Sequence, residues 1–177
     1  PGGGSFAAAR GAKLAELGFP RIDIIICVHN ALDEALACLK SVDENLEEGQ
    51  RLIIVDDCSD DCTQRALASY AAGRDDVLLI RHEQQQYYTK AANSGIRASS
   101  APYLIFLNSD TIVCENWARK LVVCANSKST IGIVGPLSNA ASWQSIPEIA
   151  GEGDQTAINT LPEGLSPRDL DKRCEEW

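Results

Sequence analysis

Two short apolar runs in this chain end at polar side chains that could bind a ligand. Residues 52–55 lead into Asp56 and Asp57, and residues 103–107 lead into Asn108, Ser109 and Asp110. Apolar runs of this length, bounded by turn-forming residues, are typical of buried strands in a parallel sheet. Ligands of open α/β sheets bind beyond the carboxyl ends of such strands. We therefore expect both groups of side chains to face one crevice.

Acidic side chains in such a crevice need a compensating partner, because they repel one another and lose hydration. Asp110 could hold Mg²⁺ or Mn²⁺ with few protein ligands, since diphosphate oxygens and water complete the octahedron. The metal would then offset the charge that develops on a leaving diphosphate. The alternative for residues 108–110 is an Asx-type turn that caps the next element. Lys90 is either a phosphate contact or a solvated surface lysine.

The acids after the second run have competing interpretations. Asp57 could accept a hydrogen bond from an N–H group of a nucleoside base, whereas Asp56 is expected to turn back into the structure. The alternative for this segment is a helix N-cap. Ser59, Asp60 and Asp61 all compete to cap a helix near Thr63. His29 is an isolated histidine, and such residues more often pack than catalyse.

The sequence lacks the motifs of several common kinds of functional site. Residues 27–32 read Cys-Val-His-Asn-Ala-Leu, so the glycine-rich turn of a dinucleotide fold or a P-loop is absent there. No Gly-x-Ser-x-Gly elbow of a serine hydrolase occurs. Cys58 and Cys62 lack the second pair of ligands that a structural zinc site needs.

Composition and charge place the chain among ordinary globular proteins. Of 177 residues, 45% are apolar and 23% charged, and the formal charge of −9 disfavours nucleic acid as a partner. No apolar run approaches the roughly 18 residues of a membrane span, which predicts a cytoplasmic protein. Seven scattered cysteines favour reduced thiols over a disulfide framework. The lack of Met, position 1 included, predicts a processed or excised piece.

Strands and helices are expected to alternate along the chain. Such alternation predicts an α/β fold whose mostly parallel central sheet is covered by helices on both faces. We expect strands at 22–28, 52–55, 77–80, 103–107 and 131–134. We expect helices from 33 to about 46, at 63–72, 89–98 and about 117–125, a weak helix at 7–17, and helical structure within 167–177.

Four ordered segments resemble the family 2 glycosyltransferases with the GT-A fold. They are residues 24–30, 54–61, 88–96 and 104–111, followed by Gly132 to Pro136. The resemblance covers residues 20–140 and implies a nucleotide-sugar-binding GT-A domain there. Residues 1–19 are then a linker and lead-in, with 1–5 as linker sequence. Residues 141–177 are an irregular tail that begins a truncated acceptor-binding part.

The resemblance also implies roles for individual residues. The reaction would be an inverting, metal-assisted transfer of sugar to an acceptor hydroxyl, with the acceptor (glycan, lipid or protein) open. Asp110 would be the metal ligand, for Mg²⁺ or Mn²⁺, with Asn93 beside the donor. The nucleotide-binding residues would be Val28, His29, Asn30, Asp57, Lys90, Asn108 and Ser109.

The sequence departs from the family at three places. Tyr87 stands where the family commonly has Gly, and Asn108 replaces an acid. The acidic motif that carries the family's general base is not found, so we expect the base beyond residue 177. Two rival functions remain open: a sugar-nucleotide nucleotidyltransferase, and a binding module for a nucleotide or glycan without turnover. The first would need a glycine-rich, basic loop, which residues 28–32 lack.

Overall fold

The computed structural model describes residues 20–141, 144–149 and 157–175. The predicted helix at 7–17 lies outside these ranges. The chain divides into two compact units, residues 1–113 and residues 114–177. The first contains both acidic segments.

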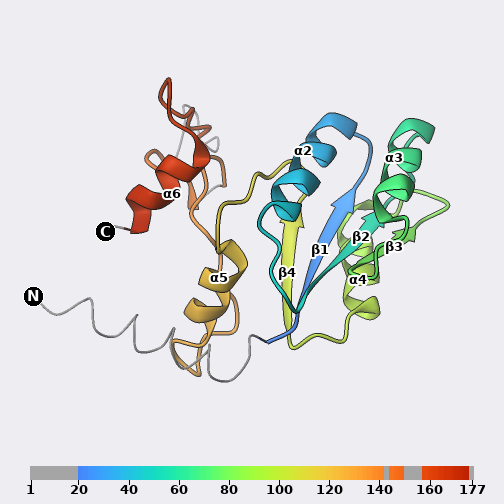
Figure 1. The fold of residues 1–177 in the computed structure, drawn as a ribbon, viewed down its shortest axis with the longest axis horizontal. Coiled ribbons are helices and arrows are strands. Elements are labelled where there is room, and N and C mark those ends of the chain that lie inside the picture. The colour runs from blue at the N-terminus through green and yellow to red at the C-terminus, as the bar shows by residue number, and fades with distance from the viewer. Residues whose placement is uncertain (1–19, 142–143, 150–156, 176–177) are drawn as a thin grey trace, which may run out of the picture. The chain divides into compact units, whose positions relative to one another are not determined.

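A sheet of four parallel strands forms the centre of the first unit (Figure 1). The strand order is β3-β2-β1-β4. β1 and β2 are buried along almost their whole length, as their β-branched, apolar sequences predict. The four strands predicted within this unit are therefore confirmed. Their bounds are β1 Ile22–Val28, β2 Gln50–Asp56, β3 Val77–Arg81 and β4 Tyr103–Asn108.

Three helices cover the sheet, and their sides follow from the strand order. The crossovers through α2 (Leu32–Asp43) and α3 (Asp61–Ala71) run outward from β1 to β3. The crossover through α4 (Tyr87–Ala98) returns across the sheet to β4, so right-handed connections put α4 on the opposite face. Figure 1 shows this arrangement. The predicted sheet with helices on both faces is confirmed.

The return of the chain from β3 to β4 creates a topological switch point. β2 and β4 both pair with β1, but the chain reaches them by crossovers in opposite directions. In open α/β sheets, ligands bind at the carboxyl ends of the strands at such a point. Residues 28–31 and 108–110 lie at this point.

Gly95 sets how closely α4 approaches the sheet. A Cβ atom at Gly95 would lie 2.5 Å from Cγ2 of Ile25 on β1, which is fully buried. We expect Gly95→Ala to lower the free energy of unfolding by about 1 to 3 kcal/mol, because helix and strand must separate. Gly132→Ala is the control, since nothing lies within 4 Å of its Cβ position. Equal thermal unfolding of both variants would contradict close packing at Gly95.

The second unit has fewer regular elements. It contains α5 (Trp117–Ala125) and α6 (Pro167–Glu175), both within predicted helical regions. Lys120 of α5 pairs with Asp171 of α6 at 2.8 Å. The strand predicted at 131–134 is wrong, because these residues form no ladder and Ile133 is 93% exposed. With Gly132 and Gly135 beside it, this apolar run lacks the side-chain packing that stabilises a strand.

Candidate functional site

A groove of about 360 Å³ lies at the topological switch point. It receives residues from the end of β1, the start of α2, the start of α4 and the turn after β4. Three of these residues, Asn108, Ser109 and Asp110, were predicted from the sequence, and the structure brings them together in this groove. The other lining residues are Cys27, Ala31, Glu34 and Tyr88.

The groove offers oxygen ligands suited to a hard divalent cation. Asp110 and Asn108 are exposed and Ser109 is half-buried, so carboxylate, amide and hydroxyl oxygens are accessible at one turn. Mg²⁺ and Mn²⁺ prefer such ligands over nitrogen or sulfur. Within the described part of the chain, no three His, Cys, Asp or Glu side chains cluster as a complete metal site. A metal here would therefore take most of its ligands from a bound ligand and water.

Glu34 was not predicted as a site residue, although it lines the same groove as Asp110. It lies in the first turn of α2. No sequence motif points to it, but a helix that follows β1 directly must begin at the edge of the sheet where β4 also ends. That topological signal could have identified Glu34.

Backbone strain is concentrated around the groove and the neighbouring strand ends. Asn30 and Ala31 after β1, Cys58 after β2 and Tyr87 at the start of α4 all have positive φ, between 51° and 64°. Residues with a Cβ rarely adopt this conformation, and such residues cluster at functional sites. The Asn30 amide donates to Ser59 Oγ at 2.9 Å, while Asn30 Oδ1 accepts from the Asp60 amide at 2.8 Å. These bonds tie the two strand ends together.

Tyr87, which stands where the family commonly has Gly, is one of these strained residues, and the strain can be tested by mutation. Its φ is 64° and its side chain is 71% exposed. Glycine adopts this conformation without the cost of roughly 1 to 2 kcal/mol that a Cβ imposes. We expect Tyr87→Gly to keep or raise the melting temperature, and Tyr88→Gly, in the same helical turn, to lower it. A larger loss for Tyr87→Gly in thermal denaturation would contradict the strain.

Asp57 is buried, and its carboxylate binds the loop that precedes α4. Oδ1 accepts hydrogen bonds from His82 Nδ1 at 2.7 Å and the Gln86 amide at 2.8 Å, and Oδ2 accepts from the Tyr87 amide at 2.7 Å. Burial alone would raise the pKa of Asp57, but these donors outweigh it and hold the pKa below its usual range. Because each carboxylate oxygen has two lone pairs, one on Oδ2 remains for a further donor.

The other predicted residues near β1 occupy different positions. Val28 is fully buried, and only its backbone reaches the rim, where Val28 O accepts from the Asp57 amide at 2.8 Å. His29 is exposed, and its Nδ1 donates to Asp57 O at 2.8 Å, which fixes the ring. Cys27 lines the groove, but burial and then the charge of Asp57 raise the pKa of its thiol to about 11. A thiolate nucleophile is therefore not available there.

The alternatives for the acidic turn are resolved by its contacts. Asp60 caps α3, because its Oδ1 accepts from the Thr63 amide at 2.8 Å. Asp56 turns inward as predicted, where it pairs with Arg81 and accepts from the Ser59 amide at 2.9 Å. Arg81 and His82 were both missed by sequence reasoning.

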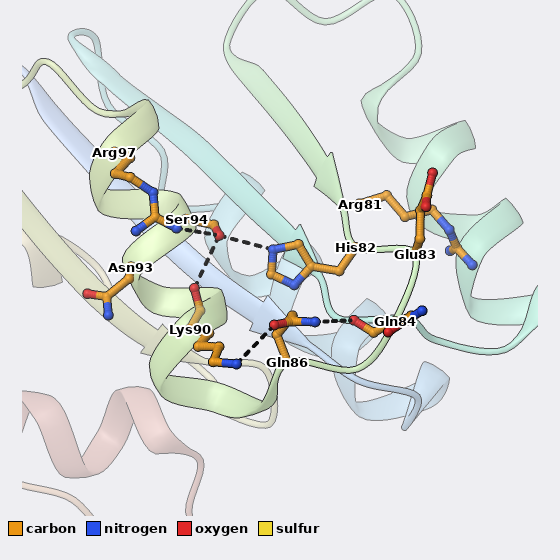
Figure 2. A pocket seen from close by; sticks show the side chains of 9 residues that line it. All are labelled: Arg81, His82, Glu83, Gln84, Gln86, Lys90, Asn93, Ser94 and Arg97. Carbon is orange, nitrogen blue, oxygen red and sulfur yellow. Dashed lines mark hydrogen bonds between the residues drawn. The ribbon is translucent and has the colours of Figure 1, made fainter.

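A second cavity, the basic pocket, holds Lys90. This pocket has a volume of about 740 Å³ (Figure 2). It shares no lining residue with the groove, so Lys90 and Asp110 belong to different cavities. Asn93 also lines the basic pocket. The complete lining is Arg81, His82, Glu83, Gln84, Gln86, Lys90, Asn93, Ser94 and Arg97.

Comparison with known proteins agrees with this architecture. Glycosyltransferase AglE of Haloferax volcanii is 26% identical over 103 residues, which are 57% of this chain and 34% of that protein. Glycosyltransferase GlyG of Streptococcus pneumoniae is 22% identical over 118 residues, which are 67% of this chain and 39% of that protein. The chain thus spans little more than a third of these curated relatives.

A solved structure shows the same fold. The mannosyltransferase PcManGT from Pyrobaculum calidifontis, in complex with GDP-Man and Mn²⁺, matches with a TM-score of 0.56 and 18% identity. The match covers 61% of this chain and 33% of that one. It confirms the predicted GT-A-type α/β fold.

Among the helices in the described ranges, none has the length and apolar character required to cross a bilayer. The family described as "Glycosyl transferase family 2" matches residues 23–138, well over half of the sequence. With the parallel sheet and the groove at its switch point, this match shows that the chain belongs to glycosyl transferase family 2.

Proposed function

We propose that this chain binds the nucleotide-sugar donor of an enzyme that transfers the sugar, with inversion, to an acceptor hydroxyl. The observation that carries the proposal is the groove where Asn108, Ser109 and Asp110 meet the end of β1. PcManGT, which shares the fold, was solved with GDP-Man and Mn²⁺, and this supports the same class of ligand. A cytoplasmic location stays a prediction from the sequence.

In this proposal each residue contacts a different part of the nucleotide-sugar donor. Asp110 would hold Mg²⁺ or Mn²⁺, and Asn108 and Ser109 would contact the ribose and phosphates. The metal would stabilise the negative charge on the departing diphosphate. His29 and Asn30, in the turn after the buried Val28, would border the nucleoside. Asp57 would accept a base N–H through its remaining lone pair on Oδ2.

The general base that activates the acceptor is not among the residues assigned above. An acceptor hydroxyl must lose its proton to a general base as it attacks the anomeric carbon. No described carboxylate is assigned that role, and the base stays predicted beyond residue 177. Lys90 lines the other cavity, so it is not assigned to the donor here, and its contact with a phosphate stays a prediction.

Titration of the chain with nucleoside diphosphates tests the proposal. We expect GDP or UDP to bind in the presence of Mn²⁺ and to bind much more weakly after chelation with EDTA. At about 100 times its dissociation constant, the ligand should raise the free energy of unfolding by about 2.7 kcal/mol. If a correctly folded chain binds neither nucleotide with Mn²⁺, the donor-binding role is wrong.

A further inference from the structure

The basic pocket is lined by hydrophilic side chains alone. All nine of its residues are charged or carry amide, hydroxyl or imidazole groups. Such a surface does not favour an apolar ligand, whereas it can donate and accept many hydrogen bonds. Its volume is about 740 Å³, and it is open to solvent, because most of its lining residues are exposed. The pocket therefore suits a polar ligand of metabolite size.

Two cations in the pocket have only neutral partners. Lys90 Nζ donates to Gln86 Oε1 at 3.2 Å, and Arg97 Nη2 donates to Ser94 Oγ at 3.1 Å. Neither pairs with a carboxylate within the described ranges, although the formal charge of the chain is −9. Two uncompensated cations at one cavity raise the local concentration of anions.

The other charged residues of the pocket do not neutralise the positive charges of Lys90 and Arg97. Arg81 is bound to the buried carboxylate of Asp56. Glu83 is the one carboxylate among the lining residues. Figure 2 shows Glu83 beside Arg81, on the side of the pocket away from the helical cations. The α4 side of the pocket is therefore the positive side.

Helical spacing aligns the donors of that positive side. Lys90, Asn93, Ser94 and Arg97 are three, four and seven positions apart on α4, so they share one face and span about 10 Å along the axis. His82 stands opposite, held by Asp57 at 2.7 Å and by Ser94 Oγ at 3.0 Å (Figure 2). The buried Asp57 carboxylate thus holds the His82 ring in place on the side of the pocket opposite α4.

We propose that the basic pocket binds a phosphorylated, hydroxyl-rich small molecule of the sugar-phosphate class. Lys90 and Arg97 bind the phosphate, since an ammonium and a guanidinium both form charge-assisted bonds with its oxygens. Gln84, Gln86 and Asn93 supply amide groups for the hydroxyls. The site is separate from the groove and does not rest on the proposed donor-binding function.

Calorimetric titration with inorganic phosphate and with glucose 6-phosphate tests this site. We expect both to bind, and glucose 6-phosphate to bind at least about threefold more tightly, because only it engages the amides. Lys90→Gln and Arg97→Gln should each weaken both affinities about tenfold, by loss of one charge-assisted bond. Arg65→Gln is the matched control, since Arg65 is exposed on α3, where its side chain donates to Cys62 Sγ at 3.6 Å, and it lines neither cavity.

The outcomes separate this site from the donor groove. Arg97→Gln should leave Mn²⁺-dependent binding of GDP or UDP unchanged, and circular dichroism should show that each variant is folded. Absence of phosphate binding, or equal losses in Arg97→Gln and Arg65→Gln, would overturn the site. Equal affinity for the two probes would overturn the hydroxyl-rich ligand class. Failure of nucleotide binding with intact phosphate binding would refute the donor proposal alone.

Discussion

Replacing Asp110 by alanine is expected to weaken the binding of a nucleoside diphosphate in the presence of Mn²⁺ by about a hundredfold. The reason is that Asp110 is the carboxylate at the turn after β4, where it lines the groove with neutral Asn108 and Ser109. Without it, the cation has no anionic protein ligand at this turn, and the diphosphate charge is left unbalanced. Isothermal titration with and without Mn²⁺ measures both effects.

The metal dependence of the Asp110→Ala variant is the decisive part of that experiment. Wild type should lose most of its affinity on addition of EDTA, whereas the variant should respond little. Asp75→Ala is the matched control, because Asp75 is an exposed aspartate just before β3, at the opposite rim of the sheet. It removes the same charge far from the groove. A variant at Asp110 that keeps the full gain from Mn²⁺ would exclude Asp110 as the metal ligand.

Replacing Asp57 by alanine is expected to lower the free energy of unfolding by about 3 kcal/mol. The substitution leaves three donors, His82 Nδ1 and the amides of Gln86 and Tyr87, without their acceptor. For a chain of this size the melting temperature should fall by roughly 6 to 12 °C. Thermal denaturation followed by circular dichroism measures it, with Asp75→Ala as a control that should change little.

The stabilisation by Asp57 should also depend on pH in a defined direction. Its pKa is lowered in the folded state, so its contribution is fully present above the unfolded value of about 3.9. That contribution is lost as the pH falls from there through the lower, folded pKa. The difference in stability between wild type and Asp57→Ala should therefore be constant above about pH 5 and shrink below pH 4. A difference that grows on acidification would contradict the assigned hydrogen bonds.

Most of the first unit could be predicted because its sequence is locally consistent with its fold. β1 and β2 are β-branched, apolar and short, and only a doubly covered parallel sheet buries such strands on both sides. The same pattern failed at residues 131–134. Four apolar or glycine residues carry no information about whether a partner strand is available, and Ile133 is left exposed.

Candidate site residues could be predicted from the sequence where one segment carries the motif, and they could not where two separate segments must meet. Asn108 ends β4, Asp110 follows it in the turn, and together they are visible as a motif. Arg81 and His82 look like ordinary polar residues after a strand. Their roles arise because β2 and β3 pair in parallel, with Asp56 opposite Arg81, which brings His82 to Asp57. Lys90 was predicted at a phosphate, but no local pattern could assign it to a cavity apart from the groove.

The contact between Gly95 and Ile25 has a consequence for how this protein adapts to its ligands. With no side chain between them, α4 and β1 are in direct contact, and close-packed interfaces of this kind resist small displacements. Helix α4 borders both cavities, through Tyr88 in one and Lys90 in the other. It is therefore a rigid wall shared by both cavities, and any change of shape on ligand binding must come from the other residues that line them.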